Sequence, residues 1–193
     1  MPAFTLRFAR AVLVFSMLLG GAAGAADSPP QLDYPADYRN WIFLTSGLDM
    51  TYSDGKMADH HMFDNVFVNP EAYKVFQATG RWPDKTILVK EVRGGLTKGS
   101  INRGGFHQQI DVMEVEVHAK DEKRFPGQWA FFVFGDNKPA AAIPKEAQCY
   151  ACHGSHGAVD NTFVQFYPTL LPIAESKKTL AAGYLKDESA AKK

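Results

Sequence analysis

The motif Cys149-Tyr150-Ala151-Cys152-His153 is the part of the chain whose residue types and spacing point most directly to chemistry. Each thiol of such a Cys-x-x-Cys-His motif can add to a haem vinyl group, and the adjacent imidazole can then bind the iron as axial ligand. A thioredoxin-type dithiol should instead lie near an early βαβ pattern, and a zinc site needs four ligands although the chain has only 2 cysteines. The motif therefore predicts one covalent haem c, held by Cys149, Cys152 and His153.

Residues 1–25 have the pattern of a secretory signal peptide. Two arginines precede an apolar run that ends at Leu19, and small residues follow up to Ala25-Ala26, where cleavage is expected. The apolar run is too short to cross a bilayer, so we expect an exported, periplasmic domain over residues 26–193 without a membrane span. Export also permits a disulfide between the two cysteines, but a disulfide leaves the placement of His153 unexplained.

The charge balance gives no sign of a polyanionic partner. The chain has 21 Lys and Arg and 21 Asp and Glu, and removal of two arginines with the leader leaves 19 minus 21, or −2. Such a chain has no long-range attraction for nucleic acid or an anionic membrane. The mature length suits a single domain with a core, and the residues from about 186 onward are expected to form a flexible tail.

The first half of the mature chain contains the elements that precede the sheet. Residues 37–44 are expected to form a short helix, and the polar stretch 49–59 a loop. Residues 65–68 predict a short strand. Asn69, with a proline directly after it, is a typical helix start, and Gly80 is a typical helix end.

The second half is predicted to be mostly strand. Residues 86–92 are β-branched and lie between a Pro-Asp turn and a Gly-Gly pair. Residues 98–105 are expected to be a Gly-rich, cationic loop. Residues 110–118 alternate between apolar and polar side chains, as in a strand with two different faces. The polar face of that strand carries Glu114, Glu116 and His118.

Residues 129–134 are apolar on both faces, which is typical of a strand that is central or packed under a cofactor. A short helix over residues 146–153 is expected to carry the haem motif. The order of elements predicts an α+β fold, with a mostly antiparallel β-sheet, a few short helices and the haem-bearing helix near the C-terminus.

The positions of the methionines argue against a simple electron carrier. Small electron-transfer cytochromes use a methionine downstream of the haem motif as second axial ligand, but every methionine here precedes His153. A ligand from an upstream histidine remains open, and the candidates are His60, His61, His107 and His118. We favour a five-coordinate iron with an open distal face, which indicates ligand binding or chemistry.

Several blocks of the sequence resemble the cytochrome P-460 family. In order they are Asn65–Tyr73, Lys90–Val92, Lys123–Phe132, Cys149–His153 and Phe166–Pro168, and together they extend over nearly all of the mature chain. The resemblance implies a small, mostly β, c-haem protein that forms a homodimer. Enzymes of the family oxidise hydroxylamine, with nitrous oxide as a product. A sister branch, the cytochromes c-prime-beta, binds nitric oxide and carbon monoxide in a pocket capped by phenylalanines.

In the enzyme branch, a lysine nitrogen is bonded to a meso carbon of the haem, and Lys90 falls at the matching place. An unpaired ammonium on the apolar strand Ile87–Val92 would be costly, and alkylation by the macrocycle would remove that cost. Alternatively, Lys90 lies on the solvent face of the sheet and pairs with an acid of a neighbouring strand. We favour the cross-link, which makes Lys90 both a cofactor-binding and a catalytic residue.

The enzymes also use a distal glutamate that takes protons from bound hydroxylamine. Glu116 matches this residue best, Glu114 lies one pleat away on the same face, and His118 is a weaker candidate for the same role. Oxidation of a nitrogen ligand releases protons as well as electrons, so a carboxylate near the iron is chemically needed. Plain solvent exposure explains the alternation of both acids equally well.

One position departs from the hydroxylamine-oxidising members. Asp64 stands where the resemblance leads us to expect an arginine, and the neighbouring Phe63 could point into the pocket as an aromatic cap, as in the gas-binding branch. Two functions therefore stay open. The first is a periplasmic cytochrome that oxidises hydroxylamine and nitric oxide towards nitrous oxide or nitrite and passes electrons to a soluble acceptor cytochrome. The second is a protein that binds nitric oxide or carbon monoxide without turnover. We favour the first, because Lys90 and Glu116 are both present.

Overall fold

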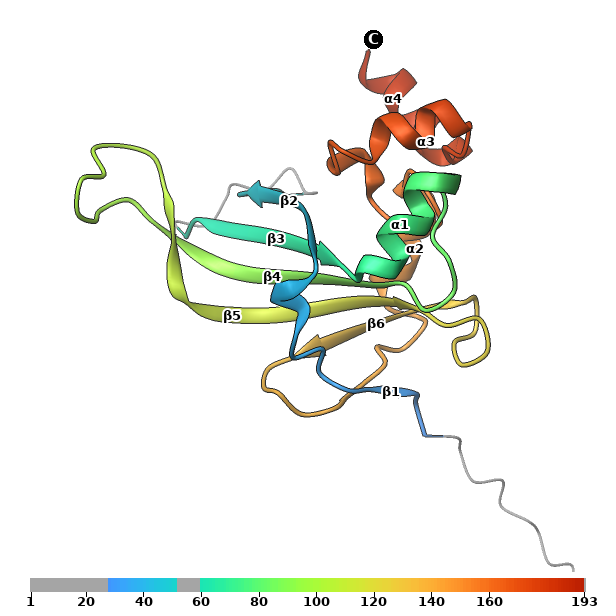
Figure 1. Cartoon of the computed structure of the whole chain (residues 1–193), viewed down its shortest axis with the longest axis horizontal. Helices are drawn as coiled ribbons and strands as arrows, with labels where there is room; N and C mark the ends of the chain where they lie inside the picture. The colour runs from blue at the N-terminus through green and yellow to red at the C-terminus, as the bar shows by residue number, and fades with distance from the viewer. Residues whose placement is uncertain (1–27, 52–59, 193) are drawn as a thin grey trace, which may run out of the picture.

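The computed structural model describes residues 28–51 and 60–192 (Figure 1). The expected signal peptide lies outside these residues, as does most of the loop expected over residues 49–59. Among the described residues, no helix is both long and apolar enough to span a membrane.

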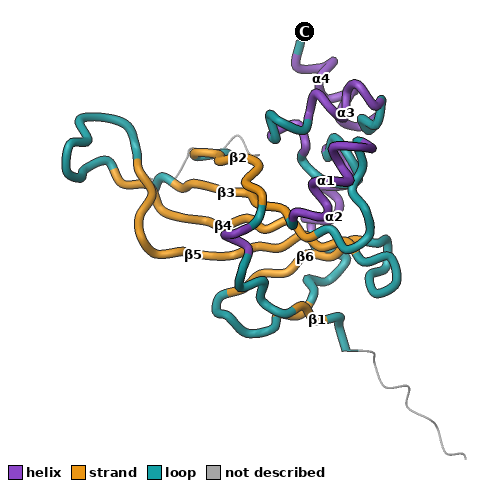
Figure 2. The backbone as a smooth tube through the Cα atoms, in the orientation of Figure 1, coloured by secondary structure: helices purple, strands orange, loops and turns teal. Residues whose placement is uncertain are grey.

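Five strands form one antiparallel sheet whose spatial order follows the sequence (Figures 1 and 2). Neighbouring strands are joined one after the other, and the long hairpin of the third and fourth strands projects beyond the rest (Figure 1). The strands are β2 (Ile42–Leu48), β3 (Met62–Val68), β4 (Ile87–Leu96), β5 (His107–Lys120) and β6 (Trp129–Phe134). Two short strands, β1 (Gln31–Leu32) and β7 (Ala140–Ala141), pair in a second antiparallel sheet.

Four α-helices gather on one side of the molecule, around one end of the large sheet (Figures 1 and 2). They are α1 (Pro70–Thr79), α2 (Gln148–His156), α3 (Leu171–Lys177) and α4 (Ala182–Ala191), and two single-turn 3₁₀ helices, η1 (Tyr38–Asn40) and η2 (Val164–Phe166), complete the described elements. The α+β prediction is confirmed, and the haem motif lies on α2 as expected.

The pleat gives the large sheet two different faces. Val66 pairs with Lys90, Lys90 with Glu116, and Glu116 with Val133, so these four residues form one row across β3, β4, β5 and β6. Since side chains directly opposite each other in a sheet share a face, this row defines the face that lies toward the haem motif. Residues one position away along each strand point to the opposite face.

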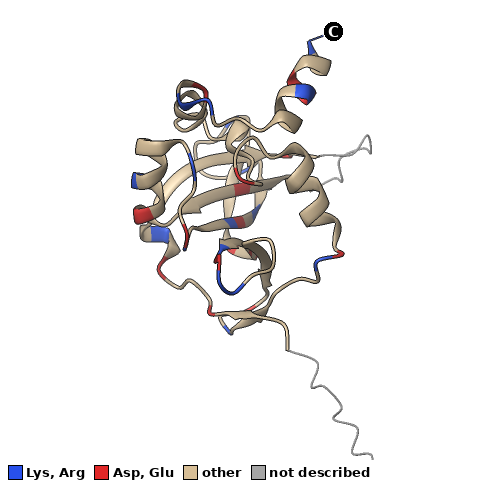
Figure 3. Cartoon of the chain, turned by 90° about the vertical axis from the view of Figure 1, so that its right-hand side faces the viewer, with Lys and Arg blue, Asp and Glu red and all other residues tan. Residues whose placement is uncertain are grey.

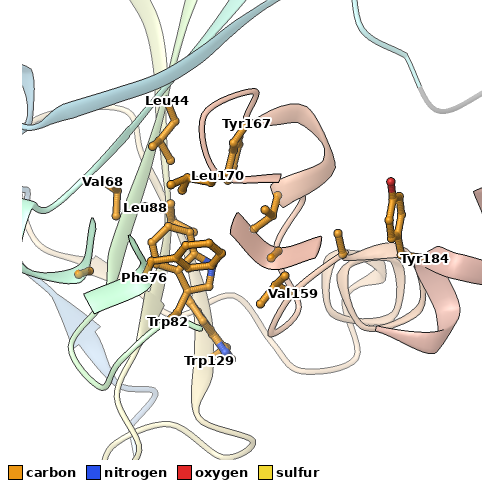
Figure 4. Packing of buried hydrophobic residues seen from close by; sticks show 14 residues of the cluster. Leu44, Val68, Phe76, Trp82, Leu88, Trp129, Val159, Tyr167, Leu170 and Tyr184 are labelled. Carbon is orange, nitrogen blue, oxygen red and sulfur yellow. The ribbon is translucent and has the colours of Figure 1, made fainter. Parts of the chain in front are cut away.

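Each face buries its own core. The helices and the first face enclose one cluster, in which Leu44, Val68 and Phe76 approach Val159 and Leu170 of the C-terminal region (Figure 4). The opposite face buries a second cluster under the N-terminal segment and η1, including Tyr38, Val89, Val117 and Phe132. Burial of these apolar side chains at about 25 cal/mol per Å² fixes the register, because a slip of one residue would exchange the two faces.

The structure shows how the residues that were predicted to start and end α1 act. Pro70 occupies its first turn, and Gly80 ends the helix in the left-handed conformation at φ 73°. A Cβ on Gly80 would lie 2.8 Å from Cβ of Lys177, so the position requires glycine for space as well as for φ. Asn69 does not cap the helix with its side chain; its Oδ1 instead accepts a hydrogen bond from the backbone N–H of Ile87 at 2.8 Å, which ties α1 to β4.

Two expectations about local structure were wrong. The helix expected over residues 37–44 is only the 3₁₀ turn η1, because residues from Ile42 onward pair with β3 instead. The Gly94-Gly95 pair does not end β4, since β5 continues the ladder to Leu96 with register shifts. Residues 186–191 of the expected tail belong to α4, and the flexibility of this tail stays a prediction.

Charged residues of both signs are interspersed over the face shown in Figure 3. That distribution agrees with the equal numbers of basic and acidic residues in the chain.

Candidate haem site

A cavity of about 600 Å³ lies between the first face of the sheet and the haem motif. All five strands of the large sheet contribute to its wall, together with α2 and residues 162–167. Its size and mostly apolar wall are typical of a pocket for a cofactor or small molecule. Cys149, Cys152, His153, Lys90 and Glu116 all line it, so the structure brings together residues that lie up to 63 positions apart (153 minus 90).

His153 has the geometry of a metal ligand. Its Nδ1 lies 2.9 Å from the backbone oxygen of Asn161. A carbonyl oxygen can only accept, so Nδ1 carries the proton and Nε2 keeps a lone pair. Burial lowers the pKa of His153, partly opposed by this hydrogen bond, and therefore favours the neutral imidazole that binds iron.

The loop after α2 positions the oxygen of Asn161. Asp160 and Asn161 both have left-handed backbone conformations, at φ 46° and 60°. The carboxylate of Asp160 accepts hydrogen bonds from the backbone N–H of Trp82, at 3.0 Å, and from Arg81, at 2.8 Å. This anchor was not predicted from the sequence. The sequence did contain a signal for this turn, namely Asp160-Asn161 shortly after the haem motif. Asp and Asn tolerate positive φ better than other non-glycine residues.

Cys149 and Cys152 carry free thiols, with Cys149 exposed and Cys152 half-buried. The disulfide alternative is therefore not what the structure contains. Within residues 28–51 and 60–192, no group of three or more His, Cys, Asp or Glu side chains is arranged to hold a metal ion directly. Two thiols, an oriented imidazole and a large apolar cavity fit a haem better than a bare metal ion.

His118 does not lie where a distal residue must lie. Its ring contacts His153, with ring centroids 4.9 Å apart, and stacks on Phe131 at 3.9 Å. Rings in direct contact leave no room for a macrocycle between them. His118 therefore lies beside the expected iron ligand His153, a position that does not fit the distal or sixth-ligand role expected for it.

The other upstream histidines lie elsewhere. Among the described residues that line the cavity, the only histidines are His118 and His153. His60 is exposed, His61 pairs with Asp49 at 2.6 Å, and Nε2 of His107 lies 3.1 Å from the backbone oxygen of Lys98. Among the described residues, these three histidines therefore lie outside the cavity wall, and the five-coordinate iron stays a prediction.

Lys90, Glu116 and Asp64 form a charged group on the cavity wall. Lys90 Nζ lies 2.8 Å from an oxygen of Glu116 and 3.9 Å from an oxygen of Asp64. The exposed fractions of the three side chains are 36%, 40% and 26%, so each is partly solvated. The pairing of Lys90 with an acid of the neighbouring strand matches the alternative interpretation of this lysine, but the pair faces the cavity and not only the solvent.

Of the other candidates, Glu114 lines the same cavity and Phe63 does not. Phe63 and Asp64 are adjacent on β3 and therefore point to opposite faces, and the cavity face is the one that carries Asp64. The expectation of Phe63 as an aromatic cap is thus wrong. Met50 and Met62 line the cavity near Asp64, and the sequence interpretation missed both.

A family model for cytochrome P-460 matches residues 35–164, which is more than half of the chain and includes the residues of the site except Phe166 and Tyr167. The chain belongs to the cytochrome P-460 family. A search of curated proteins finds no match. Membership implies a haem cofactor, and the cavity beside the Cys-x-x-Cys-His motif of this chain fits one.

Proposed function

We propose that the protein is a periplasmic, mono-haem c-type cytochrome that oxidises hydroxylamine, and nitric oxide, towards nitrous oxide or nitrite. The observation that carries the proposal is the placement of Lys90 and Glu116, in contact with each other, in the cavity that also contains His153. A protein that only binds a gas has no need for a base in its pocket, whereas oxidation of hydroxylamine releases protons.

The proposed haem would be held by thioether bonds to Cys149 and Cys152 and by the imidazole of His153, and it would supply redox chemistry and a path for electrons. Every other step is assigned to side chains. Nδ1–H of His153 donates to Asn161, which fixes the ring and raises the basicity of Nε2. Glu116 accepts a proton from the nitrogen ligand, and a soluble acceptor cytochrome takes the electrons.

Lys90 is proposed to bond through Nζ to a haem meso carbon, as in the enzymes of the family. The N–H and C–H bonds that break would release two protons and two electrons, and the electrons would pass to the soluble acceptor cytochrome of the proposal. Lys90 Nζ lies 2.8 Å from an oxygen of Glu116, and its side chain lines the cavity. An amine bonded to the macrocycle has less positive charge available for an ion pair, so the bond would release the Glu116 carboxylate to act as a base. The cross-link at Lys90 would therefore be what allows Glu116 to act as the base. Assembly as a homodimer is part of the same proposal.

The test is turnover of hydroxylamine by the purified holoprotein with an artificial electron acceptor. Glu116→Gln keeps the shape of the side chain and removes its basicity, so we expect kcat to fall by roughly 10²–10⁴-fold. The control is Asp111→Asn, which removes an exposed carboxylate from the same strand. Equal turnover by the Gln variant and the wild type would exclude Glu116 as the base.

The alternative is a cytochrome of the c-prime-beta type that binds nitric oxide or carbon monoxide without turnover. The specific observation in its favour is Asp64, which stands where the resemblance leads us to expect an arginine. In the same assay this alternative predicts stable nitric oxide binding by the wild type and no consumption of hydroxylamine.

A further inference from the structure

The cavity has an excess of carboxylates. Among its described lining residues it has Asp64, Glu114 and Glu116, against Lys90 as the only lysine or arginine. A single base is enough to explain one proton transfer. The second carboxylate in contact with the same lysine, Asp64, needs its own explanation.

Asp64 and Glu116 approach Lys90 from opposite sides. Lys90 is on β4, which lies between β3, with Asp64, and β5, with Glu116. The register places Lys90 directly opposite Glu116 and diagonally opposite Asp64, whose direct partner is Val92. The distances follow this order, since Lys90 Nζ lies 2.8 Å from Glu116 and 3.9 Å from Asp64. Both carboxylates therefore face the same part of the cavity.

The surroundings of Asp64 favour the protonated, neutral form of its carboxyl group more than bulk water would. Burial raises the pKa of Asp64, the charge of Lys90 lowers it, and the charge of Glu116 raises it further, with a raised pKa as the result. Its side chain is the least exposed of the three. If Lys90 loses positive charge by bonding to the haem, the one influence that favours the ionised form weakens. A base whose pKa is moved toward the working pH transfers protons more effectively.

We propose that Asp64 is a second proton acceptor for hydroxylamine oxidation, working beside Glu116. This inference rests on the proposed function and deepens it. Removal of two electrons from hydroxylamine gives nitroxyl, two protons and two electrons: the N–H and O–H bonds that break leave one proton for Glu116 and one for Asp64. The two electrons leave, one at a time, to the soluble acceptor cytochrome of the proposed function.

The groups that face Asp64 belong to several elements. β4 contributes Lys90, and β5 contributes Glu114 and Glu116. β2 contributes Gly47, which pairs with Asp64 and carries no charge. On the opposite wall, α2 contributes His153. Lys90 and Glu116 are the ones whose charge acts on Asp64.

The test is the pH dependence of kcat/KM for hydroxylamine in the holoprotein. Each carboxylate that must be ionised adds one to the slope with which log(kcat/KM) falls below its pKa. Protonation of hydroxylamine itself adds the same slope for every protein, so the wild type and a variant with one carboxylate fewer should differ by a slope of one. We expect the wild type to show the steeper limb. Asp64→Asn should show the shallower one with a loss of roughly 100-fold, and Asp64→Glu should restore the steeper limb. Asp111→Asn is the control.

A second measurement needs no turnover. Azide binds ferric haem as an anion, so each carboxylate that ionises nearby weakens it. Followed optically and expressed as the affinity for the azide anion alone, the affinity of the wild type should fall in two steps as the pH rises, and that of Asp64→Asn in one. The same pH dependence in the wild type and Asp64→Asn, in either measurement, would overturn the inference and leave the proposed function standing. A wild type that does not consume hydroxylamine would overturn the proposed function itself.

Discussion

Glu91 shows how differently two neighbouring acids can be used on the two faces of one strand. It follows Lys90 directly, so it points away from the cavity, where Tyr38, Arg39 and Arg93 donate hydrogen bonds to it. The Glu91 side chain is 4% exposed. Burial alone would raise its pKa, but these donors outweigh burial and lower the pKa to about 2. An acid whose charge is satisfied in this way is structural, whereas Glu116 and Asp64 share one lysine in a partly solvated cavity.

This difference predicts part of the acid sensitivity of the fold. A carboxyl with a depressed pKa stabilises the protein above its ordinary pKa of 4.5, and that stability is lost as the pH falls toward about 2. The shift corresponds to about 3 kcal/mol. Glu91→Gln should therefore lower the free energy of unfolding at pH 7, and the difference from wild type should shrink below pH 4.5.

Denaturant unfolding of both proteins across this pH range is the measurement. Asp136→Asn, which removes a carboxylate from an exposed ion pair with Lys138, should leave the acid limb close to that of the wild type. A constant difference between Glu91→Gln and wild type at every pH would show that the charge of Glu91 does not matter to stability.

At the scale of elements, the position of α2 depends on the turn that follows it. A Cβ on Gly157 would lie 2.6 Å from the backbone oxygen of His153 and 2.8 Å from the backbone N of Thr162. Glycine therefore lets the loop with Asp160 and Asn161 return close to the end of the helix. That return brings the Asn161 oxygen to Nδ1 of His153.

Gly157→Ala should consequently destabilise the protein by about 1–3 kcal/mol, through overpacking, and alter the haem spectrum through His153. Gly154→Ala is a matched control on the same helix, because a Cβ there would meet nothing within 4 Å. It should be neutral or stabilise by roughly 0.5–1 kcal/mol. Thermal unfolding measures the stability of both holoproteins, and their optical spectra report the surroundings of the haem. Equal behaviour of the two variants would contradict this role for Gly157.

The local patterns of the sequence predicted the elements that depend on local signals. Gly80 and Pro70 bound α1, and the alternation around Glu116 gave β5. The helix expected over residues 37–44 failed because pairing of Ile42 with Val68 is a long-range contact that local propensity does not contain.

The same distinction holds for the site. Alternation could show that Phe63 and Asp64 point to opposite faces, but only the assembled sheet shows which face meets the cavity. His118 shares a face with Glu116, yet lies further along β5, against His153. The anchor at Asp160 depends on Arg81 and Trp82, nearly half the chain away, so no local pattern could indicate it.

At the scale of the whole molecule, the cavity lies between two parts of the chain that are far apart in the sequence. Its sheet wall carries Lys90, and its helical wall carries Cys149, Cys152 and His153. A haem attached at both walls would tie β4 covalently to α2. The central claim, that this cavity contains a haem bonded to both the cysteines and the lysine, therefore has a direct chemical consequence.

Trypsin digestion of the purified mature protein, followed by mass spectrometry of the haem-bearing peptide, tests that consequence. The account predicts one product that contains the haem, the segment with Cys149 to His153 and the segment with Lys90. In a Lys90→Met variant, the haem peptide should contain only the cysteine segment. A haem peptide that carries only the cysteine segment would contradict the account. Lys90 would then be an ordinary partner of Glu116, and the protein would be better explained as a cytochrome that binds nitric oxide.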